Sequence, residues 1–270
     1  MSDHLEILLT NDDGIDAPGI RALYDALSAV GNVTVVAPAD DQSAVGRSMS
    51  HEVEVWEHEL GYAVEGTPAD CVVAGLAELG PFPDIVVSGC NKGANLGEYA
   101  LGRSGTISAA VEAAFFDVPA IATSLYVPVD EFDSPFDEIE TTDDEYEEAR
   151  RVTRFLAERA LDAGVFEHAA YLNVNAPLPG DDPAPIEITS PSKRYEMDAV
   201  RTGATVRLHD RVWEEMDPET IPDPRGTDRL AVVNGRVSVS PLTAPHTTNR
   251  HEILDDLAET YLESLEASGA

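Results

Sequence analysis

Two adjacent aspartates, Asp12 and Asp13, follow the apolar run Leu5–Thr10 after a single residue, Asn11, and precede Gly14. A short apolar run that ends at a tight turn predicts a buried strand. Carboxylates placed side by side at the end of a core strand repel each other unless a cation neutralises them. Asp-Asp pairs are common in this chain, so it is the position of the pair that predicts a divalent metal site. Helix capping is the alternative, although one Asp would be enough for a cap.

Further oxygen ligands follow two other predicted strands. Ser43 comes after the strand Val33–Ala37, and Asn91 comes after a strand that ends at Ser88. Taken singly, each is an ordinary turn residue, but the carboxyl ends of parallel strands meet at one edge of a sheet. Carboxylate, hydroxyl and amide oxygens suit Mg, Mn or Ca, and no cluster of cysteine or histidine indicates zinc.

A glycine-rich segment, residues 88–106, precedes a predicted helix that begins near Gly105. The N–H groups of Ser104, Gly105 and Thr106, with two hydroxyls and the helix dipole, predict a phosphate-binding site. A flexible loop with a plain Ser/Thr cap is the alternative. The segment matches neither a Walker A loop nor a GxGxxG motif.

A metal beside a phosphate-binding loop predicts hydrolysis of a phosphate monoester. The cation would neutralise phosphoryl oxygens and lower the pKa of a bound water. Asp12 either orients or deprotonates that water, or attacks phosphorus itself. No Ser/His/Asp arrangement is evident, and the histidines lie outside the glycine-rich segment.

Alternating strand and helix patterns position these residues. Apolar runs at 5–10, 33–37, 84–88 and 120–123 predict buried strands, and helical periodicity follows Pro18, Thr67 and Gly105. The run at 51–56 alternates polar and apolar residues, which predicts an exposed or antiparallel strand. The chain therefore predicts an α/β fold with a doubly wound, Rossmann-like parallel sheet.

The second half of the chain is richer in proline and glycine. We expect an α/β catalytic core over residues 1–175, a β-rich oligomerisation appendage over 176–248 and a C-terminal helix over 249–270, within one integrated domain. Alternation in Thr205–Leu208 and Arg236–Val239 predicts β-ribbon structure in the appendage.

The composition is strongly acidic. The 270 residues include 51 acidic and 17 basic residues, for a formal charge of −34, and Lys92 and Lys193 are the only lysines. This charge makes a nucleic acid polymer an improbable partner and is typical of an extreme halophile, so we expect unfolding on desalting. Cys71 and Cys90 are expected to be buried free thiols. Without a signal-like or membrane-spanning run, the sequence predicts a cytoplasmic protein.

Several of these motifs, in this order, resemble the SurE-type survival proteins, which are metal-dependent 5'/3'-nucleotidases. The resemblance covers most of the chain and rests on four segments: Leu8–Gly14 with Ala17–Gly19, Val35–Ser43, Gly66–Cys71, and Ser88–Thr106. The chain departs from the family at Ala39, where Asp commonly follows the proline.

The resemblance implies that Asp12, Asp13, Ser43 and Asn91 bind one divalent ion per subunit. It also implies that Asn95 and Ser104–Thr106 border the phosphate of a nucleoside monophosphate. The segments 226–228 and 237–242 resemble a region that exchanges between subunits in the family, which implies a homodimer or homotetramer.

Two alternatives remain at this point. A phosphatase of the haloacid-dehalogenase type would use an aspartate nucleophile, but that class normally has a DxD spacing and the acids here are adjacent. A non-catalytic nucleotide sensor would use the metal only to position the ligand phosphate.

Overall fold

The structure, a computed structural model, describes residues 4–128 and 139–244. Its elements up to β6 are β1 (Leu5–Thr10), α1 (Pro18–Leu27), β2 (Gly31–Pro38), β3 (Val55–His58), β4 (Gly61–Val64), α2 (Pro68–Ala77), β5 (Ile85–Lys92), α3 (Gly105–Phe115) and β6 (Ala120–Leu125). The later elements are η3 (Asp143–Tyr146), α4 (Glu147–Arg159), η4 (Val165–Glu167), β7 (Tyr171–Ala176), β8 (Ile186–Ile188), β9 (Met197–Thr202), β10 (Thr205–Asp210), η5 (Arg211–Glu215), α5 (Asp228–Val233) and β11 (Val237–Leu242).

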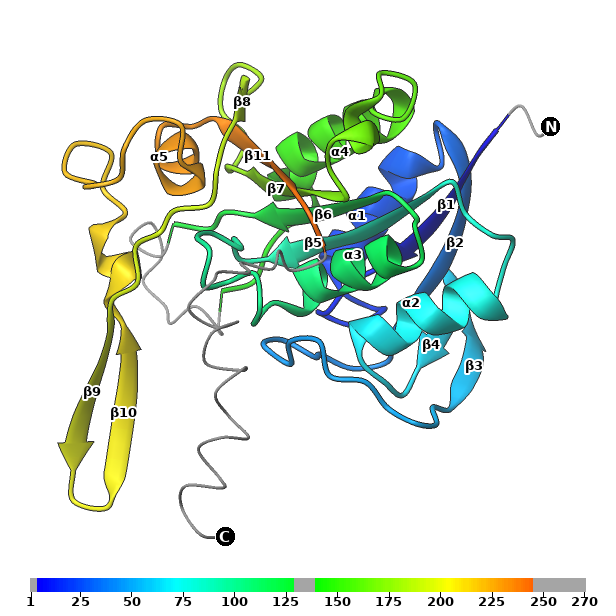
Figure 1. Cartoon of the computed structure of the whole chain (residues 1–270), viewed down its shortest axis with the longest axis horizontal. Coiled ribbons are helices and arrows are strands. Elements are labelled where there is room, and N and C mark those ends of the chain that lie inside the picture. Colours follow the sequence, from blue (N-terminus) through cyan, green and yellow to red (C-terminus); the bar gives the residue numbers. More distant parts are fainter. Residues whose placement is uncertain (1–3, 129–138, 245–270) are drawn as a thin grey trace, which may run out of the picture.

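A single large sheet organises the molecule (Figure 1). Among the described residues it has nine strands in the order β3-β4-β2-β1-β5-β6-β7-β11-β8. The strands from β4 to β7 are parallel to their neighbours, whereas β3 and β11 are antiparallel to β4 and β7. The predicted doubly wound α/β fold is therefore confirmed. The predicted antiparallel strand lies at the sheet edge, although it begins at Val55 rather than His51.

Helices cover both faces of this sheet. In Figure 1, α1 and α4 lie on one face and α2 and α3 on the other. Ile7 and Leu9 of β1 pack with the α1–α4 layer, while Leu8 between them packs with the α2–α3 layer. A strand that is buried on both faces needs a continuous apolar run, which is what the sequence has at β1.

Local capping fixes the start of α2 as the sequence predicts. The Thr67 hydroxyl accepts from the Asp70 N–H at 3.2 Å, and the Asp70 carboxylate accepts from the Thr67 N–H at 2.9 Å. This capping box satisfies two N–H groups that the first helical turn would otherwise leave unpaired. Cys71 in the same turn, and Cys90 in β5, are buried free thiols as expected.

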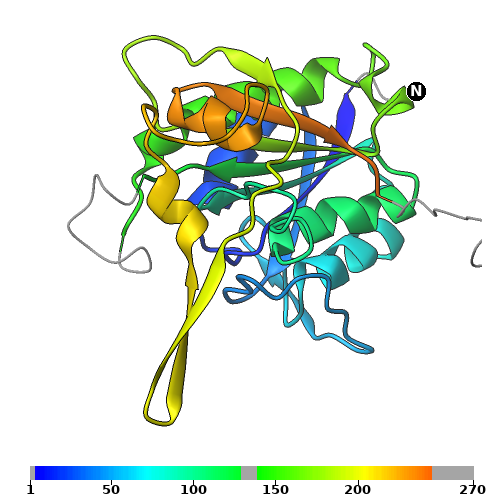
Figure 2. The same ribbon diagram turned by 60° about the vertical axis from the view of Figure 1, so that its left-hand side comes forward.

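Of the two C-terminal segments that were predicted to form β-ribbon structure, only one does so. The β9–β10 hairpin projects from the body in both views (Figures 1 and 2). Arg236–Val239 was expected in ribbon structure, but Val237–Leu242 forms β11 inside the main sheet, antiparallel to β7. Its valines are buried there against the core, which a free ribbon would leave exposed. The predicted helix over 249–270 lies outside the described residues.

The chain reverses its direction of winding at β1. Strand β1 pairs with β2 on one side and with β5 on the other, so its carboxyl end lies at a topological switch point. Ligands of open α/β sheets bind at such points. Among the described residues, no helix is long and apolar enough to cross a membrane.

Candidate functional site at the carboxyl edge of the sheet

Asp12 lies at the switch point in contact with the start of α3. Its side chain is buried, with 3% of the residue exposed, and its Oδ1 accepts from the Thr106 hydroxyl at 2.6 Å. Gly105 packs against it so closely that an added Cβ would lie 2.7 Å from the Asp12 Cβ. The positive end of the α3 dipole therefore faces the Asp12 carboxylate, which is a favourable position for an anion.

Asp13 is held by the neighbouring strand. Its Oδ2 accepts from the backbone N–H of Lys92, the last residue of β5, at 2.8 Å. This bond fixes Asp13 beside Asn91, the preceding residue of β5. The register of β1 and β5 thus determines where both aspartates lie.

The two carboxylates are poorly solvated. Burial raises the pKa of Asp12 to about 6, against the opposing effect of the Thr106 hydrogen bond. Burial and the charge of Asp12 raise the pKa of Asp13 to about 7. Both shifts mean that two negative charges are costly here and that a cation would relieve the cost.

Ser43 lies in the loop after β2, which brings it close to the two aspartates. The Gln42 N–H donates to the Asp12 carbonyl at 2.7 Å, which ties the loop to β1. The Asp41 carboxylate accepts from both the Ser43 N–H and the Ser43 hydroxyl, at 2.7 and 2.6 Å. Asp41 therefore positions Ser43 although Ala39 replaces the family's usual aspartate.

Asn95 is the centre of a buried amide network. Its side-chain amide donates to the Ser124 hydroxyl at 2.9 Å, and its N–H donates to the Asn175 amide oxygen at 2.8 Å. Its carbonyl accepts from the side-chain amides of Asn173 and Asn175. These bonds connect the glycine-rich loop to β6 and β7, so the loop is fixed where it passes the site.

The start of α3 has only part of the predicted arrangement. The Ser104 hydroxyl caps the helix by accepting from the Ile107 N–H at 3.1 Å. Thr106 and Gly105 contact Asp12, and of the three predicted residues only Ser104 lines the adjoining cavity. The helix terminus therefore already holds one anion, the Asp12 carboxylate.

Most of the predicted residues line one cavity, which has a volume of about 450 Å³. Asp12, Ser43, Asn91, Asn95 and Ser104 all line it, whereas Asp13, Gly105 and Thr106 are not among its lining residues. Its volume is within the range of small-molecule sites, ~300–1,000 Å³.

The same cavity is lined by several side chains that the sequence did not indicate: Tyr99, Arg103, Tyr126, Asp210 and Trp213. Tyr126 directly follows β6, so its place at a strand end is a signal that could have indicated it. Trp213 is in η5, after the projecting hairpin, and no local signal connects it with β1. Arg103 adds positive charge and stacks over Tyr99, with its guanidinium carbon 5.5 Å from the ring centre.

The donor set fits a hard divalent cation. One buried and one half-buried carboxylate, a hydroxyl and an amide oxygen are oxygen ligands of the kind that Mg, Mn and Ca prefer. Among the described residues, no three or more His, Cys, Asp and Glu side chains are grouped so that they alone could hold a metal ion.

Known proteins of one family resemble this chain. Residues 7–198 match the family model described as Survival protein SurE. The chain is 64% identical over 259 residues to a protein of Haloarcula marismortui named 5'-nucleotidase SurE, with 96% of each covered. It is 42% identical to a protein of Geobacter sulfurreducens with the same name, which covers 88% of the chain and 87% of the relative.

A solved structure has the same fold. The crystal structure of SurE protein from Aquifex aeolicus superposes with a TM-score of 0.74 at 32% identity, covering 96% of this chain and 99% of that one. The match extends well beyond the sheet core, because it includes nearly all of both chains. The chain therefore belongs to the SurE survival-protein family.

Proposed function

We propose that this protein is a metal-dependent 5'-nucleotidase that hydrolyses nucleoside monophosphates to nucleoside and phosphate. The observation that carries the proposal is the Asp12–Thr106 hydrogen bond, which joins the acidic end of β1 to the start of α3 beside one cavity. The names of the relatives agree with this activity.

Asp12, Asp13, Ser43 and Asn91 would hold one divalent ion, which when bound neutralises phosphoryl charge and acidifies a water. Ser104 and Asn95 border the cavity where the phosphate would lie, and Arg103 adds positive charge. Asp12 is fixed by Thr106 and is the group we assign to orient and deprotonate the attacking water. Water rather than Asp12 is the proposed nucleophile.

Phosphate release from AMP in molar salt, with and without EDTA, tests the proposal. Replacing Asp12→Asn removes the proton acceptor, and we expect a loss on the order of 10²-fold or more in kcat. Asp16→Asn is the matched control, because the Asp16 side chain is 78% exposed. Activity that survives complete metal removal, or unchanged turnover in Asp12→Asn, would contradict the proposal.

Two outcomes would favour other functions. An aspartyl phosphate trapped on Asp12 would indicate a nucleophilic aspartate, as in haloacid-dehalogenase-type phosphatases. Tight AMP binding by calorimetry without turnover would indicate a nucleotide sensor.

We also propose that the protein is a homodimer or homotetramer and that the β9–β10 hairpin takes part in the contact. Val206 and Leu208 lie on one face of the hairpin and are 53% and 69% exposed. An isolated two-stranded hairpin is marginally stable in water, so a partner surface would stabilise it. Light scattering in molar salt measures the assembly, and Leu208→Glu is expected to shift it toward the monomer.

A further inference from the structure

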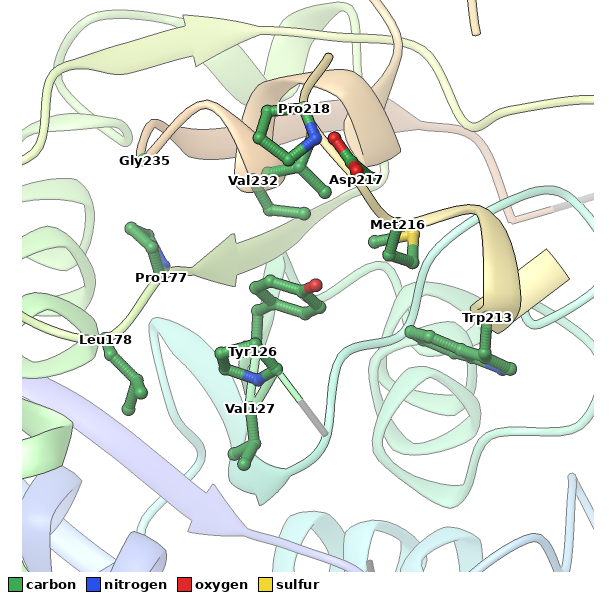
Figure 3. Close-up of a pocket in the computed structure, with 12 residues that line it drawn as sticks. Tyr126, Val127, Pro177, Leu178, Trp213, Met216, Asp217, Pro218, Val232 and Gly235 are labelled. Atoms are coloured by element: carbon green, nitrogen blue, oxygen red, sulfur yellow. The ribbon is translucent and has the colours of Figure 1, made fainter. Parts of the chain in front are cut away.

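A second cavity adjoins the proposed metal and phosphate site. It has a volume of about 430 Å³ and shares Tyr126, Val127 and Trp213 with the first cavity. Figure 3 shows Tyr126 in the middle of it, with Trp213 and Met216 on one side and Pro177 and Leu178 on the other. A molecule whose phosphate lies near Ser104 can therefore extend past two aromatic rings into this second space.

The lining chemistry suits an uncharged ring rather than a second phosphate. No basic side chain is among the described residues that line the cavity, and its one charged group is the Asp217 carboxylate. Valine, methionine and proline side chains make up much of the remainder. An anion would lack a counter-charge here, whereas an aromatic ring loses little on leaving water.

Tyr126 is held in place by its backbone and by its packing. Its backbone N–H donates to the Ala176 carbonyl at 2.7 Å, and its side chain packs with Leu96 and Val232. Only 8% of Tyr126 is exposed. Tyr126 therefore forms a rigid wall between the two cavities.

Trp213 is more exposed than Tyr126, but the turn that carries it is bound by a buried arginine. The Arg229 guanidinium donates to the carbonyls of Val212 and Glu215, at 2.6 and 3.4 Å, on either side of Trp213. Arg229 is fully buried and pairs with the carboxylate of Asp223. An indole that remains 39% exposed on so fixed a turn is preorganised to receive a planar ligand.

From these contacts we infer that Trp213 binds the base of the substrate by stacking, beside the wall that Tyr126 forms, and that the site favours purines, whose two fused rings offer more stacking surface. This inference rests on the proposed nucleotidase function. Stacking on an aromatic ring tolerates different bases, so the preference is graded by ring area rather than absolute. Trp213 determines specificity, and Tyr126 and Arg229 are positioning residues beside it.

The chain offers a matched control for testing Trp213. Its only other tryptophan, Trp56, lies on the edge strand β3 and is 45% exposed, close to the exposure of Trp213. We expect Trp213→Leu to raise KM for AMP roughly ten-fold and to bring the KM values for AMP and CMP together, with a smaller change in kcat. Trp56→Leu is expected to change neither constant.

Ribose 5-phosphate separates this inference from the function on which it rests, because it has the phosphate and sugar but no base. Trp213→Leu is expected to raise KM for ribose 5-phosphate much less than KM for AMP. An equal loss on AMP and ribose 5-phosphate, or no loss on AMP, would overturn the base site. A wild-type protein that hydrolyses neither compound with metal present would instead overturn the nucleotidase proposal.

A binding measurement needs no turnover. The Trp56→Phe variant keeps Trp213 as its single tryptophan, so adenosine that stacks there is expected to quench its fluorescence, with or without EDTA. Unchanged emission at millimolar adenosine would contradict stacking on Trp213, because the signal does not depend on the metal.

Discussion

At the residue scale, the proposed function rests on two adjacent carboxylates, the buried Asp12 and the half-buried Asp13. Burial raises the pKa of both carboxyls above the usual range of aspartate, so the charged pair is unfavourable without a cation. The same burial that makes the pair of charges unfavourable would give the proposed site affinity for a metal. The proposed metal site would therefore lower the stability of the metal-free protein at this edge of the sheet.

A pH prediction follows from Asp13. Its pKa in the folded protein lies above the unfolded value of 3.8, so the contribution of this group to stability is present below pH ~4 and is lost as pH rises to about 7. Asn at this position does not titrate. In EDTA and molar salt, we expect the Tm of Asp13→Asn to exceed that of the wild type, and the difference to grow as pH rises through this window.

Thermal melts at pH 4, 6 and 8 measure this difference, which we expect to reach a few degrees, since 1 kcal/mol corresponds to about 2–4 °C for a chain of this size. Added Mg or Mn should reverse the order at pH 8, because only the wild type has the full ligand set. An equal difference in Tm between the two proteins at all three pH values would show that ionisation of Asp13 does not destabilise the fold.

At the element scale, the contact between β1 and the first turn of α3 determines the geometry of the site. Gly105 allows this contact, because a Cβ there would lie 2.8 Å from the Asp12 Oδ2 as well as close to its Cβ. The backbone of α3 can then approach the carboxylate closely enough for the Thr106 hydroxyl to bind it.

We therefore expect Gly105→Ala to displace Asp12 and to lower kcat on the order of 10²-fold, since displacements near 1 Å have effects of that size. Gly102→Ala is the control on the same loop, because no atom lies within 4 Å of its added Cβ. Steady-state kinetics with AMP, together with circular dichroism to verify the fold, measure both variants. Equal activity of the two would show that the close approach is dispensable.

At the scale of the whole molecule, the charge of −34 determines where the fold is stable. In molar salt the Debye length is ~3 Å, so surface carboxylates scarcely repel one another, whereas at 0.1 M it is ~10 Å and they do. The relatives include proteins of Haloarcula marismortui and Natronomonas pharaonis, which agrees with adaptation to salt.

We expect the protein to lose its helical circular dichroism on dialysis from about 3 M to about 0.1 M KCl and to recover it when salt is restored. A bound divalent ion would slow the loss, because it neutralises part of the buried charge. A spectrum unchanged at 0.1 M would mean that the core alone overcomes the repulsion.

Local signals determined most of the sheet core. Apolar runs of strand length predicted β1, β2, β5 and β6, and Thr67 and Pro68 predicted the start of α2. Because the ends of parallel strands share one edge, the sequence also predicted that Asp12, Ser43 and Asn91 would meet, and they line one cavity. These features depend on neighbours in the chain and on one rule of topology.

The tertiary structure alone decided what comes from distant segments. The Asp228 carboxylate accepts from the Gly97 N–H across 131 residues of sequence, and α5 thereby packs against the loop that carries Tyr99. Placement of Trp213 beside Tyr126, and of β11 beside β7, depends on the same long-range packing. Hydrophobic periodicity shows which side of an element is buried, but it does not specify which remote element covers it, because that choice minimises the free energy of the whole fold.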